Sequence, residues 1–240
     1  MLRPFFIFAL MVSPILPNND FKQDQLKYSR VRNAYKLKES TIKVLFQQKG
    51  IDYNSFEIFL RAFKKEKKLQ LFAKSKKNEK FKLLKTYNFC MLSGKLGPKR
   101  KQGDLQVPEG FYHIDRFNPA SSYHLSLGVN YPNKSDRISG NRNNLGGDIF
   151  IHGNCVSIGC IPITDDKIKE LYVIAVEAKS KGQAKIPVHI FPAKMDVLPE
   201  NKPELKPFWK NLKRGYDYFE KNKKLPKVTV DAGGKYIFGS

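Results

Sequence analysis

The stretch between Phe56 and Tyr87 constrains the fold more than any other part of this sequence. It contains three apolar runs, and Lys-rich polar segments separate them. In the first run Phe56, Ile58, Leu60 and Ala62 recur with the period of two that is typical of a strand. Lysines at the tips of the turns discourage edge pairing with other chains. The pattern predicts three consecutive strands joined by charged hairpin turns.

The rest of the chain mixes strands with a few amphipathic helices. Helices are predicted over 20–49, with a possible break near Ser40–Thr41, over 165–181, where Thr164 supplies a capping hydroxyl, and over 207–221. Further strands are predicted over 88–94, 111–114, 122–129, 148–152 and 186–191, with a last hairpin over 228–238. A long polar loop is predicted over 130–147, which is a length more often functional than not. We therefore expect an α+β fold, a mainly antiparallel β-sandwich with flanking helices.

With 240 residues the chain suits one domain of ordinary size with extensions. We expect a signal peptide over 1–17, a helical lead-in over 18–52, a central catalytic domain over 53–196 and a C-terminal helix and hairpin over 197–240. Arg3, a short apolar run and a polar turn at Pro17–Asp20 are typical of a secretory signal sequence. The run is too short to span a bilayer. A buried N-terminal strand is the alternative; export would place the protein in the periplasm.

The charge balance is strongly positive, with 44 Lys and Arg against 22 Asp and Glu, a formal net charge of +22. Such a field favours an anionic partner, for example an acidic polymer of the cell wall. The plainer interpretation is that scattered lysines decorate solvated turns. No Arg-rich helix, RNP-like aromatic motif or full zinc-finger spacing indicates a nucleic-acid reader.

The stretch from Asp148 to Pro162 contains most of the residues that could carry chemistry. It holds one of four histidines, His152, and two of three cysteines, Cys155 and Cys160. An unperturbed thiol is only slightly ionised near pH 7, so a nucleophilic cysteine needs a base or a positive environment. We predict that Cys160 is a nucleophile, that His152 is its base, and that the Gly153 carbonyl orients the imidazole. The amides of Gly159 and Cys160 could then stabilise an oxyanion.

Three alternatives remain open from spacing alone. Cys155 and Cys160 could form a short-loop disulfide in an oxidising compartment, which would make Cys155 a redox partner of the nucleophile. His152, Cys155 and Cys160 could bind zinc together with His113, His124 or His189. Both cysteines could also be ordinary buried residues, as is expected of Cys90 in its apolar run.

The stretch from His152 to Cys160 resembles the catalytic signature of the L,D-transpeptidase catalytic-domain (YkuD-like) family. More narrowly it resembles the Gram-negative murein branch, which includes the enzyme that detaches the outer-membrane lipoprotein from peptidoglycan. The likeness runs from about Phe56 to Met195. It also includes the motifs at 93–99, 103–104, 108–112, 123–126, 131–133 and 188–192.

The resemblance assigns a role to each residue of the signature. Cys160 matches the family nucleophile, His152 its base and Gly153 the residue whose carbonyl steadies that base, while Ser157 and Gly159 match further members of the signature. Asn154, Tyr123 and His124 are expected to contact substrate. Ile158 departs from the wider family, which has a histidine there, and the family arginine after the cysteine is absent. Arg137 or Arg142 is expected to replace it in binding the substrate carboxylate.

The resemblance implies a peptidoglycan-modifying cysteine enzyme of the L,D-transpeptidase type, involved in cell-wall organisation and cell shape. The Cys160 thiolate would attack the diaminopimelate carbonyl of a stem peptide and pass the acyl group to an amine. One alternative is an amidase that hydrolyses a link between diaminopimelate and the lysine of a lipoprotein. An alternative of another class is an inactive peptidoglycan-binding protein. No cofactor, metal, nucleic-acid partner or stable membrane span is expected.

Overall fold

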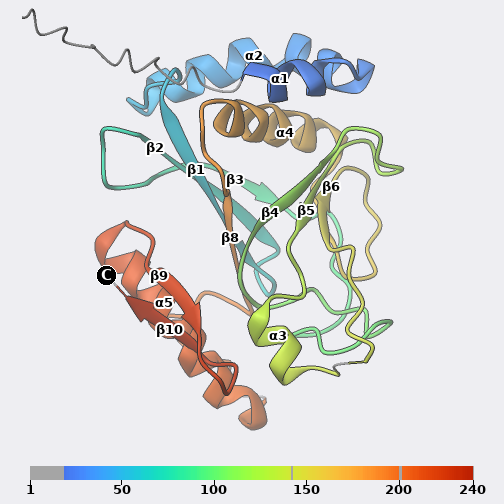
Figure 1. Cartoon of the computed structure of the whole chain (residues 1–240), viewed down its shortest axis with the longest axis vertical. Helices are drawn as coiled ribbons and strands as arrows, with labels where there is room; N and C mark the ends of the chain where they lie inside the picture. Colours follow the sequence, from blue (N-terminus) through green and yellow to red (C-terminus); the bar gives the residue numbers. More distant parts are fainter. Residues whose placement is uncertain (1–18, 142, 200–201, 240) are drawn as a thin grey trace, which may run out of the picture.

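One eight-stranded sheet forms the centre of the protein in the computed structural model, which describes residues 19–141, 143–199 and 202–239. Its strand order is β3-β2-β1-β8-β4-β5-β6-β7. The strands are β1 (Phe56–Phe63), β2 (Lys68–Ser75), β3 (Lys82–Asn88), β4 (Gly110–Asn118), β5 (Ser126–Val129), β6 (Phe150–His152), β7 (Ile161–Pro162) and β8 (Pro187–Phe191). The α+β class is confirmed, and the strands form one curled sheet (Figure 1).

The three predicted strands between Phe56 and Tyr87 are confirmed as the antiparallel ladder β1-β2-β3. Strand β8 then joins this ladder to the rest of the sheet, because it pairs parallel with β1 and antiparallel with β4. At the far end β6 pairs antiparallel with β5 and parallel with β7. The sheet therefore places β6 and β7 at the edge opposite the lysine-rich hairpins.

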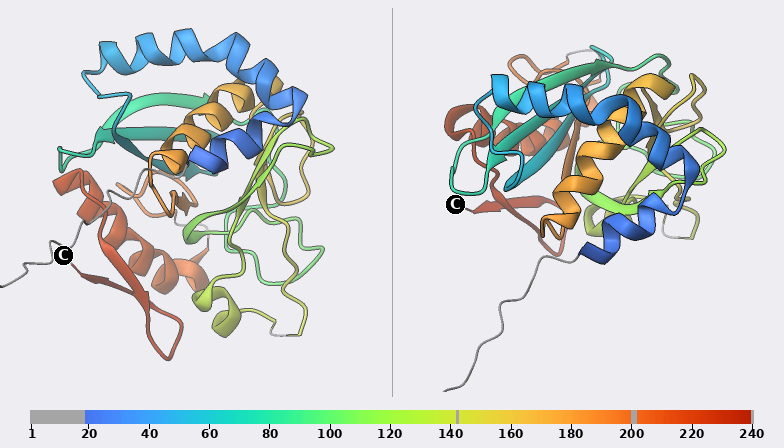
Figure 2. Two further views of the ribbon diagram at one scale, coloured as in Figure 1. Left: turned by 45° about the horizontal axis from the view of Figure 1, so that its top comes forward. Right: turned by 90° about the horizontal axis from the view of Figure 1, so that it is seen from above.

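Helices cover one face of the sheet. The helices α1 (Asn19–Leu26) and α2 (Ser29–Gln48) pack on α4 (Asp165–Ser180), and α4 in turn contacts β1, β5 and β6 (Figures 1 and 2). Helix α4 is buried on nearly every side for this reason, and Ile168, Leu171 and Ala175 are fully enclosed. Because successive side chains of a strand point to opposite faces, Ile58 and Leu60 face this helical layer and join the main core.

The C-terminal extension covers the opposite side of β1. It comprises the short 3₁₀ helix η1 (Pro203–Leu205), helix α5 (Lys206–Asn222) and the hairpin β9 (Lys227–Val230) with β10 (Tyr236–Gly239). Phe219 of α5 packs against Phe59 and Phe72 of the sheet, and Phe63 belongs to the cluster around Trp209. This explains why Phe59 and Phe63, on the face that alternation leaves to solvent, are buried.

Several local predictions are wrong, each for a local reason. The lead-in breaks at Lys27–Tyr28, between α1 and α2, and not near Ser40–Thr41. The predicted strand over 88–94 is irregular beyond Asn88, and 122–125 forms a turn before β5. The polar loop contains α3 (Lys134–Ser139), which begins with a capping box between Asn133 and Asp136. Thr164 precedes α4, but its side chain makes no capping hydrogen bond.

Two predicted features lie outside the described residues: the signal peptide over 1–17 and the arginine at position 142. Among the described residues, no helix is both long enough and apolar enough to cross a membrane.

We expect Phe219→Ala to destabilise the whole domain by about 3–5 kcal/mol, because it leaves a cavity between α5 and the sheet. Phe219 is 1% exposed and contacts three aromatic rings of the sheet and its hairpins, those of Phe59, Phe72 and Phe81. Urea unfolding measures the loss, and Lys210→Ala on the exposed face of α5 is the control. A change below about 1 kcal/mol for Phe219→Ala would show that the extension is not part of the cooperative unit.

Candidate active site

The register of β6 and β7 brings His152 and Cys160 to the same place. Ile151 pairs with Ile161 and His152 with Pro162, so Cys160 lies one residue before this short parallel ladder, beside Phe150. The Phe150 amide donates to the Cys160 Sγ at 3.4 Å, which confirms that position. Side chains two residues apart on a strand share a face, so Cys160 and His152 are neighbours on one face of the sheet edge.

Both side chains line one small cavity of about 170 Å³. The other residues that line it are Met91, Tyr123, Val156, Ser157 and Ile158. His152 is almost fully buried, and the Tyr123 ring lies over it with centroids 4.7 Å apart. Ile158 is 77% exposed at the cavity. Among the described residues that line the cavity, His152 is the titratable base.

The His152 ring is held by the backbone, as the signature predicts. Its Nδ1 forms a short hydrogen bond with the carbonyl of Gly153. A nitrogen facing a carbonyl must carry the proton, which leaves Nε2 unprotonated and able to accept one. Burial lowers the pKa of His152 below its ordinary value, and the bond to Gly153 opposes this only in part. The imidazole is therefore neutral near pH 7, as a general base must be.

Gly153 is required by crowding around its α-carbon. A methyl group there would lie 2.5 Å from the Asp165 Oδ1 and 2.9 Å from the Tyr123 carbonyl oxygen. Asp165, at the start of α4, also accepts a hydrogen bond from the Asn154 amide at 2.7 Å. Asn154 has a positive φ of 59°, and its Oδ1 accepts from the Cys155 amide. Helix α4 thus fixes the turn that orients the Gly153 carbonyl.

Cys160 is a neutral thiol at rest. Burial raises its pKa; the Phe150 amide and the charge of Lys99 oppose this, and Asp148 adds to it. Its Sγ is 3.5 Å from the Asp148 carbonyl oxygen, the acceptor that the thiol faces. The site is therefore a neutral thiol beside a neutral imidazole, so ionisation of Cys160 has to be coupled to proton transfer.

The cysteine pairing differs from every alternative drawn from spacing. Cys90 and Cys155 form a disulfide with a Cα–Cα distance of 5.5 Å, and Cys160 is free. The expectation that Cys90 is an ordinary core residue is wrong, and so is Cys155 as the disulfide partner of Cys160. A cysteine already in a disulfide has no thiolate to offer zinc, which removes the zinc alternative. Met91 and Val156, which each follow one of the paired cysteines, line the cavity.

The predicted oxyanion donors are engaged in this structure. The amides of Gly159 and Cys160 both donate to the Ser157 Oγ, at 3.2 and 3.1 Å, and Ser157 donates in turn to the Cys160 carbonyl. Ser157 also bonds to Ser93 at 2.9 Å. Ser157 therefore shapes the turn that carries Cys160. Gly159, with a φ of 135°, has a conformation that L side chains rarely adopt.

The remaining predicted site residues lie at different distances from this cavity. Tyr123 lines it, whereas His124, with a positive φ of 72°, has a buried Nε2 without a hydrogen-bond partner among the described residues. Arg137 lies on α3 and lines another cavity, together with Lys134, Ile138 and Leu145. The structure thus does not bring Arg137 to Cys160. Met91 and Lys99 were not anticipated, because only the tertiary fold brings 91–99 beside the Cys160 turn.

An α+β scaffold with a free cysteine and an oriented histidine in one cavity has the parts of a cysteine-nucleophile site. A family model, YkuD: L,D-transpeptidase catalytic domain, matches residues 58–190. The chain is also 38% identical over 185 residues to "Putative L,D-transpeptidase YafK" of Escherichia coli K12, covering 75% of this chain and 73% of that protein. The same identity and coverage hold for the protein of that name from E. coli O157:H7. The chain therefore belongs to the L,D-transpeptidase catalytic-domain family.

Two solved structures share part of the fold at low sequence identity. The helical cell shape determining protein Pgp2 of Campylobacter jejuni is 20% identical, with a TM-score of 0.46, over 70% of this chain and 58% of that one. Bd1075 of Bdellovibrio bacteriovorus is 23% identical, with a TM-score of 0.41, over 69% of this chain and 57% of that one. The chain therefore spans less than two thirds of either protein.

We expect the native protein to expose one reactive thiol, with an alkylation midpoint above that of free cysteine, because burial raises the pKa of Cys160. Iodoacetamide alkylation followed across pH by intact mass measures both quantities, with N-acetylcysteine as the reference and Cys160→Ala as the blank. Reduction and unfolding should then release two further thiols, those of Cys90 and Cys155, which makes three in all. A midpoint below that of free cysteine would instead indicate a resting thiolate–imidazolium pair. More than one thiol in the native protein would contradict the disulfide.

Proposed function

We propose that the protein is a periplasmic cysteine acyltransferase of the L,D-transpeptidase type that acts on peptidoglycan stem peptides. The observation that carries the proposal is the pairing of the free Cys160 thiol with His152, whose Nδ1 faces the Gly153 carbonyl, in one cavity. Membership of the family supports the substrate class. The 38% identity to the putative L,D-transpeptidase YafK, over most of both chains, supports the same type of activity.

The proposed first half-reaction forms a thioester on Cys160. As the Sγ attacks the diaminopimelate carbonyl carbon, its proton passes to the His152 Nε2, so that neither group has to be charged beforehand. The tetrahedral oxyanion collapses, the C–N bond breaks, and the imidazolium returns the proton to the departing amine. The leaving group is D-Ala or a linked lysine, and the acyl group stays on Cys160.

The second half-reaction reverses these proton transfers. An incoming amine loses a proton to His152 as it attacks the thioester, and the Cys160 thiolate leaves and recovers that proton. Water in place of the amine gives hydrolysis, which is the amidase alternative. For the Gly159 and Cys160 amides to stabilise the oxyanion, the Ser157 hydroxyl has to turn away from them when substrate binds.

The charge of the protein suits such a substrate. Stem peptides carry carboxylates, and a net charge of +22 raises the local concentration of an anionic polymer at low ionic strength. Arg137, the predicted partner of a substrate carboxylate, lines a different cavity on α3. A peptidoglycan-linked lipoprotein is a proposed partner through the lysine leaving group.

Purified protein incubated with defined muropeptides, with and without a lysine-linked peptide, tests the proposal by mass spectrometry of the products. We expect Cys160→Ala to lose at least about 10³-fold in rate, and His152→Gln about 10²–10⁴-fold, since one removes the nucleophile and the other the base. His113→Gln is the matched control, because His113 lies on β4 and lines a different cavity.

The products distinguish the alternatives. An amine-linked product supports transfer, and a free carboxylate with released lysine peptide supports the amidase. Binding of muropeptides without any product, while Cys160 is reduced, would contradict both enzyme activities. It would favour the alternative of an inactive peptidoglycan-binding protein.

A further inference from the structure

We propose that Trp209 of the C-terminal extension is a positioning residue for Cys160, because it holds the segment 94–107 against the turn that carries the thiol. The inference rests on the proposed role of Cys160 as nucleophile, but not on the identity of its substrate. It assigns a task to the extension in addition to covering the sheet.

The connection starts at Glu109, whose carboxylate is fully buried just before β4. Its Oε2 accepts from the Trp209 Nε1 at 2.8 Å, and its Oε1 accepts from the Gly97 amide at 2.7 Å. Removal of a donor from a buried carboxylate is costly, because no water can replace the lost hydrogen bond. The indole N–H of α5 is therefore part of what keeps Glu109, and with it Gly97, in place.

Lys64, the residue after β1, forms the ion pair with Glu109 in the same cluster. Its ammonium group is fully buried, lies 3.0 Å from the Glu109 Oε1, and donates to the carbonyls of Gly97 at 2.6 Å and Val107 at 2.9 Å. A single buried ion pair thus binds the backbone of the segment 94–107 at Gly97 and at Val107. Because buried ion pairs persist only when their remaining donors and acceptors are satisfied, the pair depends on Trp209 as well.

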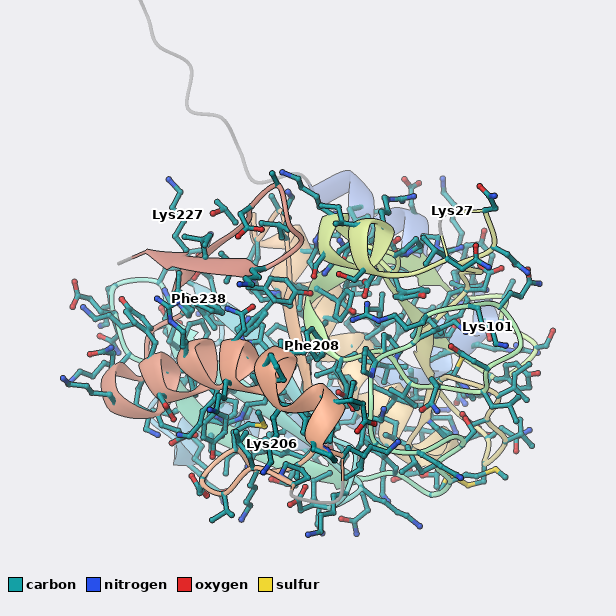
Figure 3. All side chains as sticks on the ribbon, turned by 90° about the horizontal axis from the view of Figure 1, so that it is seen from below. Lys27, Lys101, Lys206, Phe208, Lys227 and Phe238 are labelled. Carbon is teal, nitrogen blue, oxygen red and sulfur yellow. A yellow bond between two sulfur atoms is a disulfide. The ribbon has the colours of Figure 1, made fainter. Side chains whose placement is uncertain are left out.

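The start of α5 meets the same segment at two further points. The Leu205 Cδ1 would lie 3.0 Å from a methyl group placed on Gly97, and the Arg100 guanidinium lies 5.3 Å from the centre of the Phe208 ring. Figure 3 shows Phe208 on α5. Leu205, Phe208 and Trp209 therefore form one contact surface against the segment 94–107 and the adjacent Glu109.

The segment in turn touches the Cys160 turn. The Gln106 carbonyl oxygen would lie 3.1 Å from a methyl group on Gly159, and Ser93, just before the segment, bonds to Ser157. The segment also contains Lys99, whose ammonium is held by Asp104 at 2.7 Å and by the Lys101 carbonyl. The charge of Lys99 favours the Cys160 thiolate and opposes the effect of burial on the pKa.

Packing alone does not explain a tryptophan at position 209. The same helix already anchors the extension through Leu212, Tyr216 and Phe219, all buried. What Trp209 adds is an N–H directed at the Glu109 carboxylate, which also accepts from the Gly97 amide. A phenylalanine would fill most of the space and lose only that donor.

The test compares Trp209→Phe with wild type by following iodoacetamide alkylation of Cys160 across pH. We expect the pH midpoint of Cys160 alkylation to rise by about 0.5 pH unit in Trp209→Phe, which is about a threefold slower reaction near neutral pH. The reason is that the segment that carries Lys99 is less firmly fixed, so its charge stabilises the thiolate less. Tyr216→Phe is the matched control. It removes a hydrogen bond from the same helix to Asp196 and should leave the profile unchanged.

If Trp209 had only a structural role, Trp209→Phe and Tyr216→Phe would both melt earlier than wild type. The alkylation profiles of both variants would then superimpose on the wild-type profile. That outcome overturns the proposal. If Trp209→Phe does not fold, Phe208→Leu decides, because Phe208 is partly exposed and contacts Arg100. A shift in the same direction supports the proposal, and an unshifted profile overturns it.

A double-mutant cycle with Lys99→Met tests whether Trp209 affects Cys160 through Lys99. If Trp209 acts through Lys99, the two substitutions together should shift the profile no further than Lys99→Met alone. Fully additive shifts would contradict this route. Alkylation needs no peptidoglycan, so the two proposals fail separately. A lack of muropeptide products would contradict the proposed function and leave this inference standing. An unshifted alkylation profile would contradict this inference and leave the proposed function standing.

Discussion

The backbone pairing of β8 is the constraint on which the rest of the structure depends. This strand forms hydrogen bonds with β1 on one side and β4 on the other, so it joins the two halves of the described sheet. Its side chains are buried on both faces, because Val188 and Ile190 join the main core and Phe191 joins the cluster around Trp209. The ladder continues from β4 through β5 to β6 and β7, and the register of β6 and β7 brings His152 beside Cys160.

The chemistry of the site follows from burial more than from charge. Enclosing His152 beneath Tyr123 lowers the pKa of the imidazole, and enclosing the Cys160 thiol raises that of the sulfur. The two shifts leave both groups neutral, so a proton has to move as the reaction proceeds. The disulfide between Cys90 and Cys155 removes the other two thiols and joins two segments that line the cavity. One reactive sulfur remains beside one oriented base.

A buried ion pair joins the extension to this site. Burying Lys64 and Glu109 is unfavourable unless every donor and acceptor around them is satisfied, and Gly97, Val107 and Trp209 satisfy them. These residues come from separate parts of the chain, so the pair makes their arrangement mutually dependent. The proposed function needs only the cavity, whereas the further inference explains how a helix after the catalytic domain can affect it.

The sequence by itself determined the class of fold, the hairpin ladder over 56–87, and helices α4 and α5. It also singled out Cys160, His152 and Gly153, which the structure brings together at one cavity. Periodicity and a local signature carry that information, since neighbours in sequence decide both. It could not reveal the Cys90–Cys155 pairing, the Lys64–Glu109–Trp209 cluster, the place of Arg137 or the Ser157 contacts to the Gly159 and Cys160 amides. Each of these joins residues or fixes orientations only after the sheet has closed. Local pattern specifies elements and residue types, and the packing of distant segments decides which polar groups meet.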